Sequence, residues 1–269
     1  MNYIQIEINA EKQIQELLIA QLTEIGFNGF EETDTILNAF IQEELFNLTS
    51  FNEILVTYNL SFQQITIPKQ NWNELWESNF SPVIIDDFVG IRANFHQSQQ
   101  NVEYEIVITP KMSFGTGHHA TTFSVIQLMR EVDFKNKIVF DFGTGTGILA
   151  ILAEKLGASK VLAVDNDDWC IENATENCTI NNCQTIDIQK VTNAQSTLQF
   201  QIVIANINKN IILENLQFLQ NSLASNGVII LSGLLIEDEA DILKAVQPLN
   251  WHHQKTIQKG IWIAMLFNN

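Results

Sequence analysis

The sequence is short of positive charge, of cysteine and of long apolar runs, and each shortage excludes a class of protein. Of 269 residues only 14 are Lys or Arg, whereas 31 are Asp or Glu, so the net charge is −17. Proteins that hold nucleic acid by its phosphates need clustered basic residues, and we therefore expect no direct nucleic-acid binding. The acidity fits a Lys-rich partner, or it serves only to keep the protein in solution.

The few cysteines and the absence of membrane signals predict a cytoplasmic protein. Cys170, Cys178 and Cys183 form no CxxC pair, and an odd count fits a reducing cytosol without disulfides. No spacing of cysteine and histidine predicts a metal site. No apolar run approaches the roughly 18 residues that span a bilayer, and residues 1–10 lack the basic flank and apolar block of a secretory signal.

Hydrophobic residues make up 46% of the chain, enough for a core, and their pattern changes along it. Residues 1–67 predict the order β-α-β-β-α-β of a small ferredoxin-like α+β domain, in which Asn9 and Ser50 are the expected helix N-caps. Residues 68–82 predict a linker helix with Trp72 and Trp76 on one face, where the ordinary role of such a pair is packing between domains.

Residues 83–269 predict an α/β domain with a parallel, doubly wound sheet. Helical and β-rich stretches alternate, and the last two strands, separated only by Lys259 and Gly260, must form an antiparallel hairpin. Five parallel strands followed by such a hairpin make a seven-stranded, Rossmann-like sheet of the type found in methyltransferases. The strands predicted for this sheet are 137–140, 160–164, 185–191, 201–205, 228–231, 251–258 and 261–267.

The strongest local signal is DFGTGTG at residues 141–147, which follows a predicted strand and opens a predicted helix. Glycines let the backbone turn sharply and approach a ligand, and the helix N-terminus attracts an anionic group. The next strand ends in Asp165, twenty residues beyond Gly145, where a carboxylate can accept hydrogen bonds from both ribose hydroxyls. The pattern predicts a nucleoside cofactor at Gly145 and its neighbours, with Asp165 on the ribose.

This geometry serves two cofactors. GTGILA at residues 145–150 satisfies the G-x-G-x-x-A pattern of dinucleotide sites, with Asp165 at the expected acid position. Two features favour S-adenosylmethionine instead. First, Asp141 would repel a pyrophosphate but can meet the cationic methionine end of S-adenosylmethionine. Second, typical NAD-binding folds lack the C-terminal hairpin. A glycine-rich turn without a ligand is the third interpretation.

Two more stretches converge on this loop in the predicted topology. Residues 112–122 join flexible glycines, hydroxyls and imidazoles, and form either a lid over the cofactor or a surface loop. Thr121 or Thr122 is the expected N-cap of the next helix, and His119 is either a base or a structural loop histidine. Asn206 ends an apolar strand, where its amide oxygen can accept a hydrogen bond from an amine, unless it only forms a turn or cap.

With these pieces in place, the whole chain resembles the bacterial ribosomal protein L11 methyltransferases, the PrmA family. The most specific stretch is FGTGHHATT at residues 114–122, which is similar to the family's FGTG-x-H-x-TT. The glycine loop is less specific, because many methyltransferases share it. The resemblance extends to DND at 165–167, ANI at 205–207, LSG at 231–233 and the tryptophan pair of the linker.

The resemblance implies an enzyme that uses S-adenosylmethionine to methylate lysine ε-amines and the N-terminal α-amine of L11, up to trimethylation. It implies that the small N-terminal domain recognises this basic protein of the large ribosomal subunit. By matching position, the cofactor contacts are Thr122, Gly143, Asp165 and Asn206. We expect Asn206 also to hold the acceptor amine, with Thr116 as a second candidate.

Three positions depart from the family's usual pattern, and other functions remain open. Thr109, Lys111 and Ala120 replace an Asp, a Gly and a frequent Pro, without removing a matched contact. A NAD-dependent oxidoreductase fits the same loop, and a degenerate partner in ribosome assembly fits the same fold. Another protein or a small molecule is a further candidate acceptor, although NINK at 206–209 differs from the Asn-Pro-Pro-Tyr of glutamine-modifying relatives.

Overall fold

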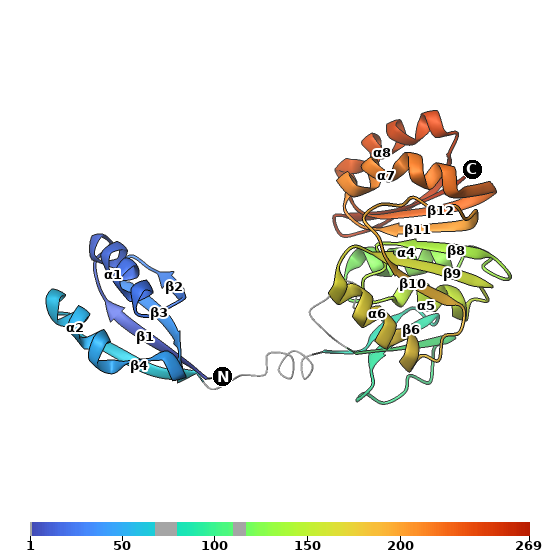
Figure 1. Ribbon diagram of the computed structural model, residues 1–269. Coiled ribbons are helices and arrows are strands. Elements are labelled where there is room, and N and C mark those ends of the chain that lie inside the picture. The colour runs from blue at the N-terminus through green and yellow to red at the C-terminus, as the bar shows by residue number, and fades with distance from the viewer. Residues whose placement is uncertain (1, 68–79, 110–116) are drawn as a thin grey trace. The chain divides into compact units, whose positions relative to one another are not determined.

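The computed structural model describes residues 2–67, 80–109 and 117–269 (Figure 1). The chain divides into two compact units, Met1–Leu75 and Trp76–Asn269, each with a hydrophobic core of its own. Most of the linker helix expected at 68–82, including Trp72 and Trp76, lies outside the described residues. Within the described ranges, no helix is both long enough and apolar enough to cross a membrane.

In the first unit, a four-stranded antiparallel sheet carries both helices on one face. β1 lies between β3 and β4, and β2 pairs with β3, which gives the order β2-β3-β1-β4. Ile4, Ile6 and Ile8 of β1 are buried against Leu18 of α1 and Phe51 of α2, as their alternation with polar residues predicts. The elements follow the predicted order: β1 (Tyr3–Asn9), α1 (Lys12–Glu24), β2 (Gly29–Glu32), β3 (Ile36–Gln42), α2 (Leu48–Tyr58) and β4 (Phe62–Ile67).

Both N-caps predicted for this unit are wrong. Asn9 stays paired in the sheet as the last residue of β1, and α1 begins after Glu11 without a side-chain cap. Asn47 caps α2, because its Oδ1 accepts hydrogen bonds from the backbone N–H groups of Thr49 (3.0 Å) and Ser50 (3.2 Å). These are N–H groups that the helix itself leaves without partners, so an Asn three residues earlier takes the role expected of Ser50.

The second unit begins with a small sheet of three strands, β5 (Val83–Ile85), β6 (Val89–Ala93) and β7 (Tyr104–Ile108). β5 and β6 are antiparallel, whereas β6 and β7 are parallel. The order is β5-β6-β7, so one edge of β7 has no strand beside it in the described part of the chain. Side chains of α6 (Asp168–Ile180) and of the residue after it lie along that edge.

The main sheet has seven strands in the order β10-β9-β8-β11-β12-β14-β13. Neighbouring strands are parallel except where β14 joins β12 and β13, so the predicted antiparallel hairpin at the end is confirmed. The predicted strands are present, and the largest difference is in β12, which is much longer than 228–231. The strands are β8 (Ile138–Phe142), β9 (Lys160–Asp165), β10 (Ile186–Lys190), β11 (Phe200–Asn206), β12 (Leu223–Leu235), β13 (His252–Lys259) and β14 (Trp262–Asn268).

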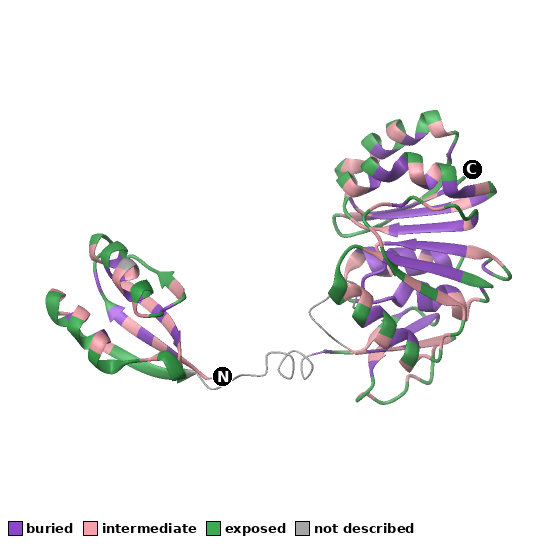
Figure 2. Ribbon diagram, in the orientation of Figure 1, coloured by how far each residue is buried: buried purple, intermediate pink, exposed green. Residues whose placement is uncertain are grey.

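Helices cover both faces of the main sheet, and its interior strands are buried along most of their length (Figures 1 and 2). One apolar cluster joins the sheet to α4 (Ala120–Met129) and α5 (Ile148–Lys155). The other joins the opposite face to α7 (Lys209–Ser222) and α8 (Glu239–Val246). This is the layered α/β architecture expected from alternating strands and helices.

The register of the sheet brings three strand ends to one edge. Ile204 of β11 pairs with Asp141 of β8, and Phe142 of β8 pairs with Val164 of β9. The carboxyl ends of β8, β9 and β11 therefore lie side by side, with Asn206 ending β11. Ligands of open parallel sheets bind outside such an edge, and the predicted site residues belong to it.

Candidate functional site

The glycine turn at 143–147 joins β8 to α5 and is pinned to the neighbouring strand. The backbone N–H groups of Gly143 and Thr144 both donate 2.9 Å hydrogen bonds to the carbonyl oxygen of Val164. Gly143 has a φ of +82°, in the left-handed region that glycine adopts without a Cβ penalty. A Cβ at Gly143 would lie 2.1 Å from Cγ2 of Ile207, so a side chain cannot fit there unless Ile207 moves.

Asp165 fastens the same turn from the end of β9. Its Oδ2 accepts a 3.0 Å hydrogen bond from the N–H of Gly145. Its Oδ1 accepts hydrogen bonds from the N–H groups of Asn166 (2.8 Å) and Asp167 (3.1 Å). A carboxylate has about four acceptor positions, so Asp165 can accept these three backbone hydrogen bonds and still accept one from a ligand hydroxyl group. The structure thus brings together Gly143, Gly145 and Asp165, as the sequence predicts.

Asp141 lies beneath the turn and is fully buried. Thr144 donates a hydrogen bond from Oγ1 to Oδ2 of Asp141, whereas Oδ1 has no partner among the described residues. Burial raises the pKa of Asp141 to about 7, and the negative charge of Asp165 adds to this effect. A buried carboxylate with a free oxygen is costly unless a cation or a donor meets it.

Asn206 and Thr122 meet at the end of β11, although 84 positions separate them in the sequence. Nδ2 of Asn206 lies 3.4 Å from Oγ1 of Thr122, which sits in the first turn of α4. Oδ1 of Asn206 is buried and has no hydrogen-bond partner in the described ranges. This oxygen is therefore available to a donor from a ligand or an acceptor substrate.

Ile207 is a residue of this edge whose packing the sequence did not reveal. Its N–H donates a 3.1 Å hydrogen bond to the carbonyl oxygen of Ser232 on β12. A Cβ on Gly233 would lie 2.0 Å from the carbonyl oxygen of Ile207, and Gly233 has a φ of +82°. Ile207 is thus held between Gly143 and Gly233. The only signal in the sequence was the Ser-Gly pair at 232–233.

His119 caps α4, in place of the predicted Thr121 or Thr122. Nδ1 of His119 accepts a hydrogen bond from the N–H of Thr121 (3.3 Å) and lies 2.8 Å from Oγ1 of the same residue. Both threonines are buried within the first turn instead. The His119 ring also packs edge-on against Trp262 of β14, with 4.7 Å between centroids. A nitrogen engaged in capping is a poor candidate for a base.

Thr116, predicted beside Asn206, lies outside the described residues. The chain that follows it is held close to the small sheet, because a Cβ on Gly117 would lie 2.6 Å from Cδ1 of Ile91 on β6. Gly117 also has a φ of +89°, which other residues rarely adopt. Glycine is therefore required where this segment passes β6 toward α4.

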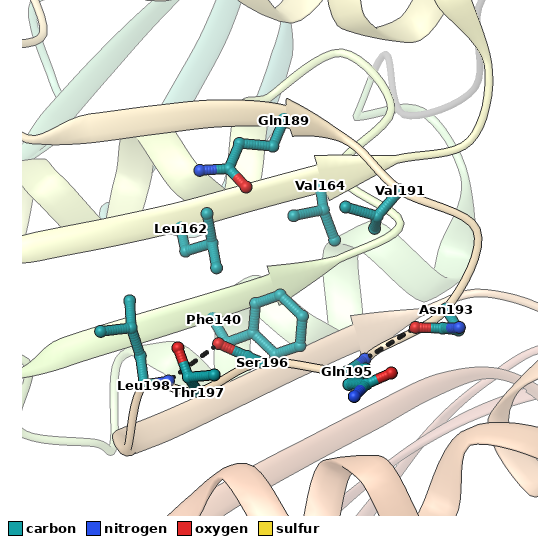
Figure 3. A pocket seen from close by; sticks show the side chains of 10 residues that line it. All are labelled: Phe140, Leu162, Val164, Gln189, Val191, Asn193, Gln195, Ser196, Thr197 and Leu198. Carbon is teal, nitrogen blue, oxygen red and sulfur yellow. Dashed lines mark hydrogen bonds between the residues drawn. The ribbon is translucent and has the colours of Figure 1, made fainter.

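A pocket of about 400 Å³ lies away from these strand ends, on the face of the main sheet that packs against α7 and α8 (Figure 3). Its floor consists of Phe140, Leu162 and Val164, and the loop at 193–198 forms its rim. None of the predicted site residues lines it. The pocket occurs where a loop, and not a helix, covers β8, β9 and β10.

Together, the strand ends present negative charge and hydrogen-bond acceptors to a ligand. A glycine turn with no room for a side chain at Gly143 lies between a partly exposed carboxylate, Asp165, and a buried one, Asp141. Two carboxylates would repel the phosphates of a dinucleotide, but they suit a ligand with hydroxyl groups and a cationic end. The free oxygens on Asp141 and Asn206 are the buried acceptors that such a ligand would satisfy.

Comparison of the whole sequence with known proteins points to one family. The sequence profile described as ribosomal protein L11 methyltransferase (PrmA) matches residues 31–269. A protein of Porphyromonas gingivalis named ribosomal protein L11 methyltransferase is 37% identical over 260 residues, which cover 94% of this chain and 90% of that protein. A protein of the same name from Phocaeicola vulgatus is 36% identical, with 99% of each chain aligned.

Solved structures agree with the sequence comparison. The ribosomal protein L11 methylase of Lactobacillus delbrueckii subsp. bulgaricus matches with a TM-score of 0.65 and 29% identity, over 70% of this chain and 98% of its own. A putative RNA methyltransferase of Pyrococcus horikoshii matches with a TM-score of 0.50 and 18% identity, over 58% of this chain and 85% of its own, which shows the fold alone. The α/β sheet is thus of the methyltransferase type, and this chain belongs to the ribosomal protein L11 methyltransferase (PrmA) family.

Proposed function

We propose that this chain transfers methyl groups from S-adenosylmethionine to lysine ε-amines and the N-terminal α-amine of ribosomal protein L11, up to trimethylation. Relatives named ribosomal protein L11 methyltransferase align along almost the whole chain, which supports the proposal. The structural observation that carries it is a pair of buried oxygens, Oδ1 of Asp141 and Oδ1 of Asn206, near the ends of adjacent strands, for which the described residues offer no hydrogen-bond partner. A dinucleotide would leave Asp141 beside its phosphates.

The cofactor contacts of the proposal are Thr122, Gly143, Gly145, Asp165 and Asn206. Asp165 would accept hydrogen bonds from ribose hydroxyls, and the glycine turn would let the backbone lie against the ligand. Asp141 would meet the cationic methionine end directly or through water. When bound, S-adenosylmethionine supplies a methyl group on a sulfonium centre, which a neutral amine accepts by in-line displacement.

Asn206 is the residue that we assign to the acceptor amine, with Thr116 as a second candidate. The free Oδ1 of Asn206 can accept a hydrogen bond from the amine and so direct the nitrogen lone pair. A lysine amine has a reference pKa of about 10.4, and desolvation favours its neutral form. Loss of the proton to water then needs no dedicated base, which agrees with the capping role of His119.

The proposal also divides the chain into domains and names their roles. We propose a ferredoxin-like domain at 1–67 that binds the substrate protein, a linker helix at 68–82 and a catalytic domain at 83–269. The net charge of −17 suits a basic ribosomal protein and disfavours direct binding to nucleic acid. A cytoplasmic location fits such a substrate and three cysteines that are all free.

Intact-mass measurement of L11 tests the proposal. L11 from a strain that lacks this enzyme is incubated with the purified protein and S-adenosylmethionine, and its mass should rise by whole methyl groups. Peptide mapping then identifies the amines. An unchanged mass, with NADH and not S-adenosylmethionine binding in separate titrations, would favour an oxidoreductase. Methylation of other proteins or of small molecules, but not of L11, would correct the substrate.

A further inference from the structure

Amide side chains at the end of α6 take the place of a missing strand beside β7. Oδ1 of Asn181 accepts a 3.0 Å hydrogen bond from the N–H of Val107, and Nδ2 donates a 2.6 Å hydrogen bond to the carbonyl oxygen of Val107. One helical turn earlier, Oδ1 of Asn177 accepts a 2.8 Å hydrogen bond from the N–H of Thr109. The unpaired edge of β7 is therefore satisfied by side chains instead of a strand.

Asn177 differs from Asn181 because it also reaches the glycine turn. Its Nδ2 donates a 2.8 Å hydrogen bond to the carbonyl oxygen of Thr146, and it lies 3.2 Å from Oδ1 of Asn173. Asn177 is fully buried, and Thr146 is nearly so. A single side chain thus joins the end of β7 to the turn at 143–147.

The peptide that Asn177 holds is the one that starts α5. The carbonyl oxygen of this Thr146–Gly147 peptide accepts the hydrogen bond from Asn177. The N–H of the same peptide, that of Gly147, donates a 2.9 Å hydrogen bond to the carbonyl oxygen of Thr144. A Cβ on Gly147 would lie 3.2 Å from the Cβ of Ala174, so α6 also packs directly on the turn. The turn cannot shift toward α6, and Asn177 prevents it from shifting away.

We propose that Asn177 is a positioning residue for the cofactor, and that it acts through the carbonyl group of Thr146. This inference rests on the proposed function, since it assigns Asn177 to the turn that would bind S-adenosylmethionine. Loss of the amide donor removes the buried hydrogen bond that fixes the direction of the Thr146 carbonyl group, and the turn is then free to rearrange. The turn is then no longer preorganised for the cofactor, so the affinity for the cofactor falls. The rate of methyl transfer from bound cofactor stays the same.

A pair of matched substitutions tests the contact between Asn177 and the glycine turn. Asn177→Asp keeps an oxygen for the N–H of Thr109 but replaces the donor to Thr146 with an acceptor. Asn181→Asp makes the same chemical change one helical turn away, where the side chain binds the backbone of Val107 and the carbonyl oxygen of Asn177 but has no hydrogen bond to the glycine turn in the described part of the chain. Calorimetric titration with S-adenosylhomocysteine, thermal unfolding and steady-state kinetics are measured for both variants and the unaltered protein.

We expect Asn177→Asp to weaken binding by about ten-fold or more, and Asn181→Asp by less than about two-fold. The KM for S-adenosylmethionine should rise with Asn177→Asp, whereas kcat at saturating cofactor should stay within a few-fold. If Asn177→Asp does not fold, Asn177→Ser is compared with Asn181→Ser in the same assays.

Equal losses of affinity in the two variants, or a fall in kcat without a rise in KM, would overturn the inference and leave Asn177 a purely structural residue. Failure of the unaltered protein to bind S-adenosylhomocysteine is a different result. That outcome would remove the proposed function, and the positioning role would fall with it.

Discussion

Oγ1 of Thr144 donates a 2.6 Å hydrogen bond to Oδ2 of Asp141, while Oδ1 of the same fully buried carboxyl group has no partner in the described part of the chain. Thr144 and the backbone N–H of Ala150 favour the charged form but do not replace the water that the carboxylate loses, and burial raises the pKa of Asp141 to about 7. Without ligand, the protein therefore holds a carboxyl group that is only partly ionised near neutral pH. A cation bound beside it would stabilise the charged form.

The first prediction concerns stability. The pKa of Asp141 is about 7 in the folded chain against an ordinary value of 3.8, so the folded state binds the proton more tightly than the unfolded chain does between these pH values. This contribution to stability is present at acidic pH and is lost as pH rises through about 7. Asp141→Asn removes the buried charge and should raise the free energy of unfolding at pH 8 by roughly 2 kcal/mol.

Urea denaturation at pH 5 and pH 8 checks this prediction. The difference between Asp141→Asn and the unaltered protein should be larger at pH 8, where the native carboxylate is charged. An equal difference at both pH values would mean that Asp141 does not titrate in this range. The same variant should bind S-adenosylmethionine poorly, because the neutral amide cannot balance the cationic end of the cofactor.

The second prediction is the pH dependence of cofactor affinity. If the ionised form of Asp141 receives the cationic end, the affinity for S-adenosylmethionine should fall as pH drops below about 7, by up to about ten-fold per pH unit. Titration calorimetry from pH 5.5 to 8.5 gives the profile. Asp141→Asn should bind weakly with a flat profile, and a sloping profile in that variant would assign the proton to another group.

The third prediction concerns Asp165, which has a structural and a ligand-binding role. Asp165→Ala removes the acceptor of the Gly145 N–H as well as the proposed ribose contact, so binding should weaken by about 100-fold or more. Asp168→Ala is the matched control, because this exposed carboxylate pairs only with the surface residue Lys190 among the described ion pairs. Unchanged calorimetric affinity in Asp165→Ala would remove the ribose assignment.

The fourth prediction separates binding from chemistry at Asn206. Asn206→Ala should lower cofactor affinity by only a few-fold, because Asn206 is one of five proposed cofactor contacts and its hydrogen bond to Thr122, another of them, is long at 3.4 Å. Turnover should fall by about 100-fold, since the free Oδ1 that would direct the amine is lost. Single-turnover rates of L11 methylation measure the chemical step separately from cofactor binding. Asn206→Asp keeps an oxygen acceptor and should retain more activity than Asn206→Ala; the reverse order would contradict amine positioning.

Much of the site could be predicted from the sequence because it follows from strand ends. The turn at 143–147, Asp165 and Asn206 each come directly after or at the end of an apolar strand, and parallel topology places such residues at one edge. The seven-stranded sheet followed from the same alternation, since a hairpin too short for a crossover must be antiparallel.

Other features could not be predicted, because they depend on contacts between distant segments. Asn177 and Thr146 lie 31 positions apart, and nothing in either local pattern indicates their hydrogen bond. His119 was expected to be a loop residue or a base, and it caps α4 because the helix begins two residues earlier than a Thr121 cap predicts and three earlier than a Thr122 cap predicts. N-cap preferences are small free energies, so neighbouring polar residues compete and the chain path decides between them.

The last prediction tests the contact between Ile207 and Gly143. Gly143→Ala should destabilise the protein by about 3 kcal/mol, because the new Cβ meets Cγ2 of Ile207 at 2.1 Å and the residue keeps a φ of +82°. Ile207→Ala should relieve only the first of these costs, since the Cβ of Ile207 would be 3.6 Å away, an ordinary contact. The double variant should therefore be less destabilised than the sum of the single variants.

Gly260→Ala supplies the reference for backbone strain alone. Gly260 has a φ of +62° in the β13–β14 turn, and nothing lies within 4 Å of its added Cβ, so the cost should be about 1 kcal/mol. Thermal or urea unfolding of the four variants gives the coupling energy between positions 143 and 207. We expect this coupling to be at least about 1 kcal/mol, whereas strictly additive effects would show that Ile207 does not rest on the glycine turn in solution.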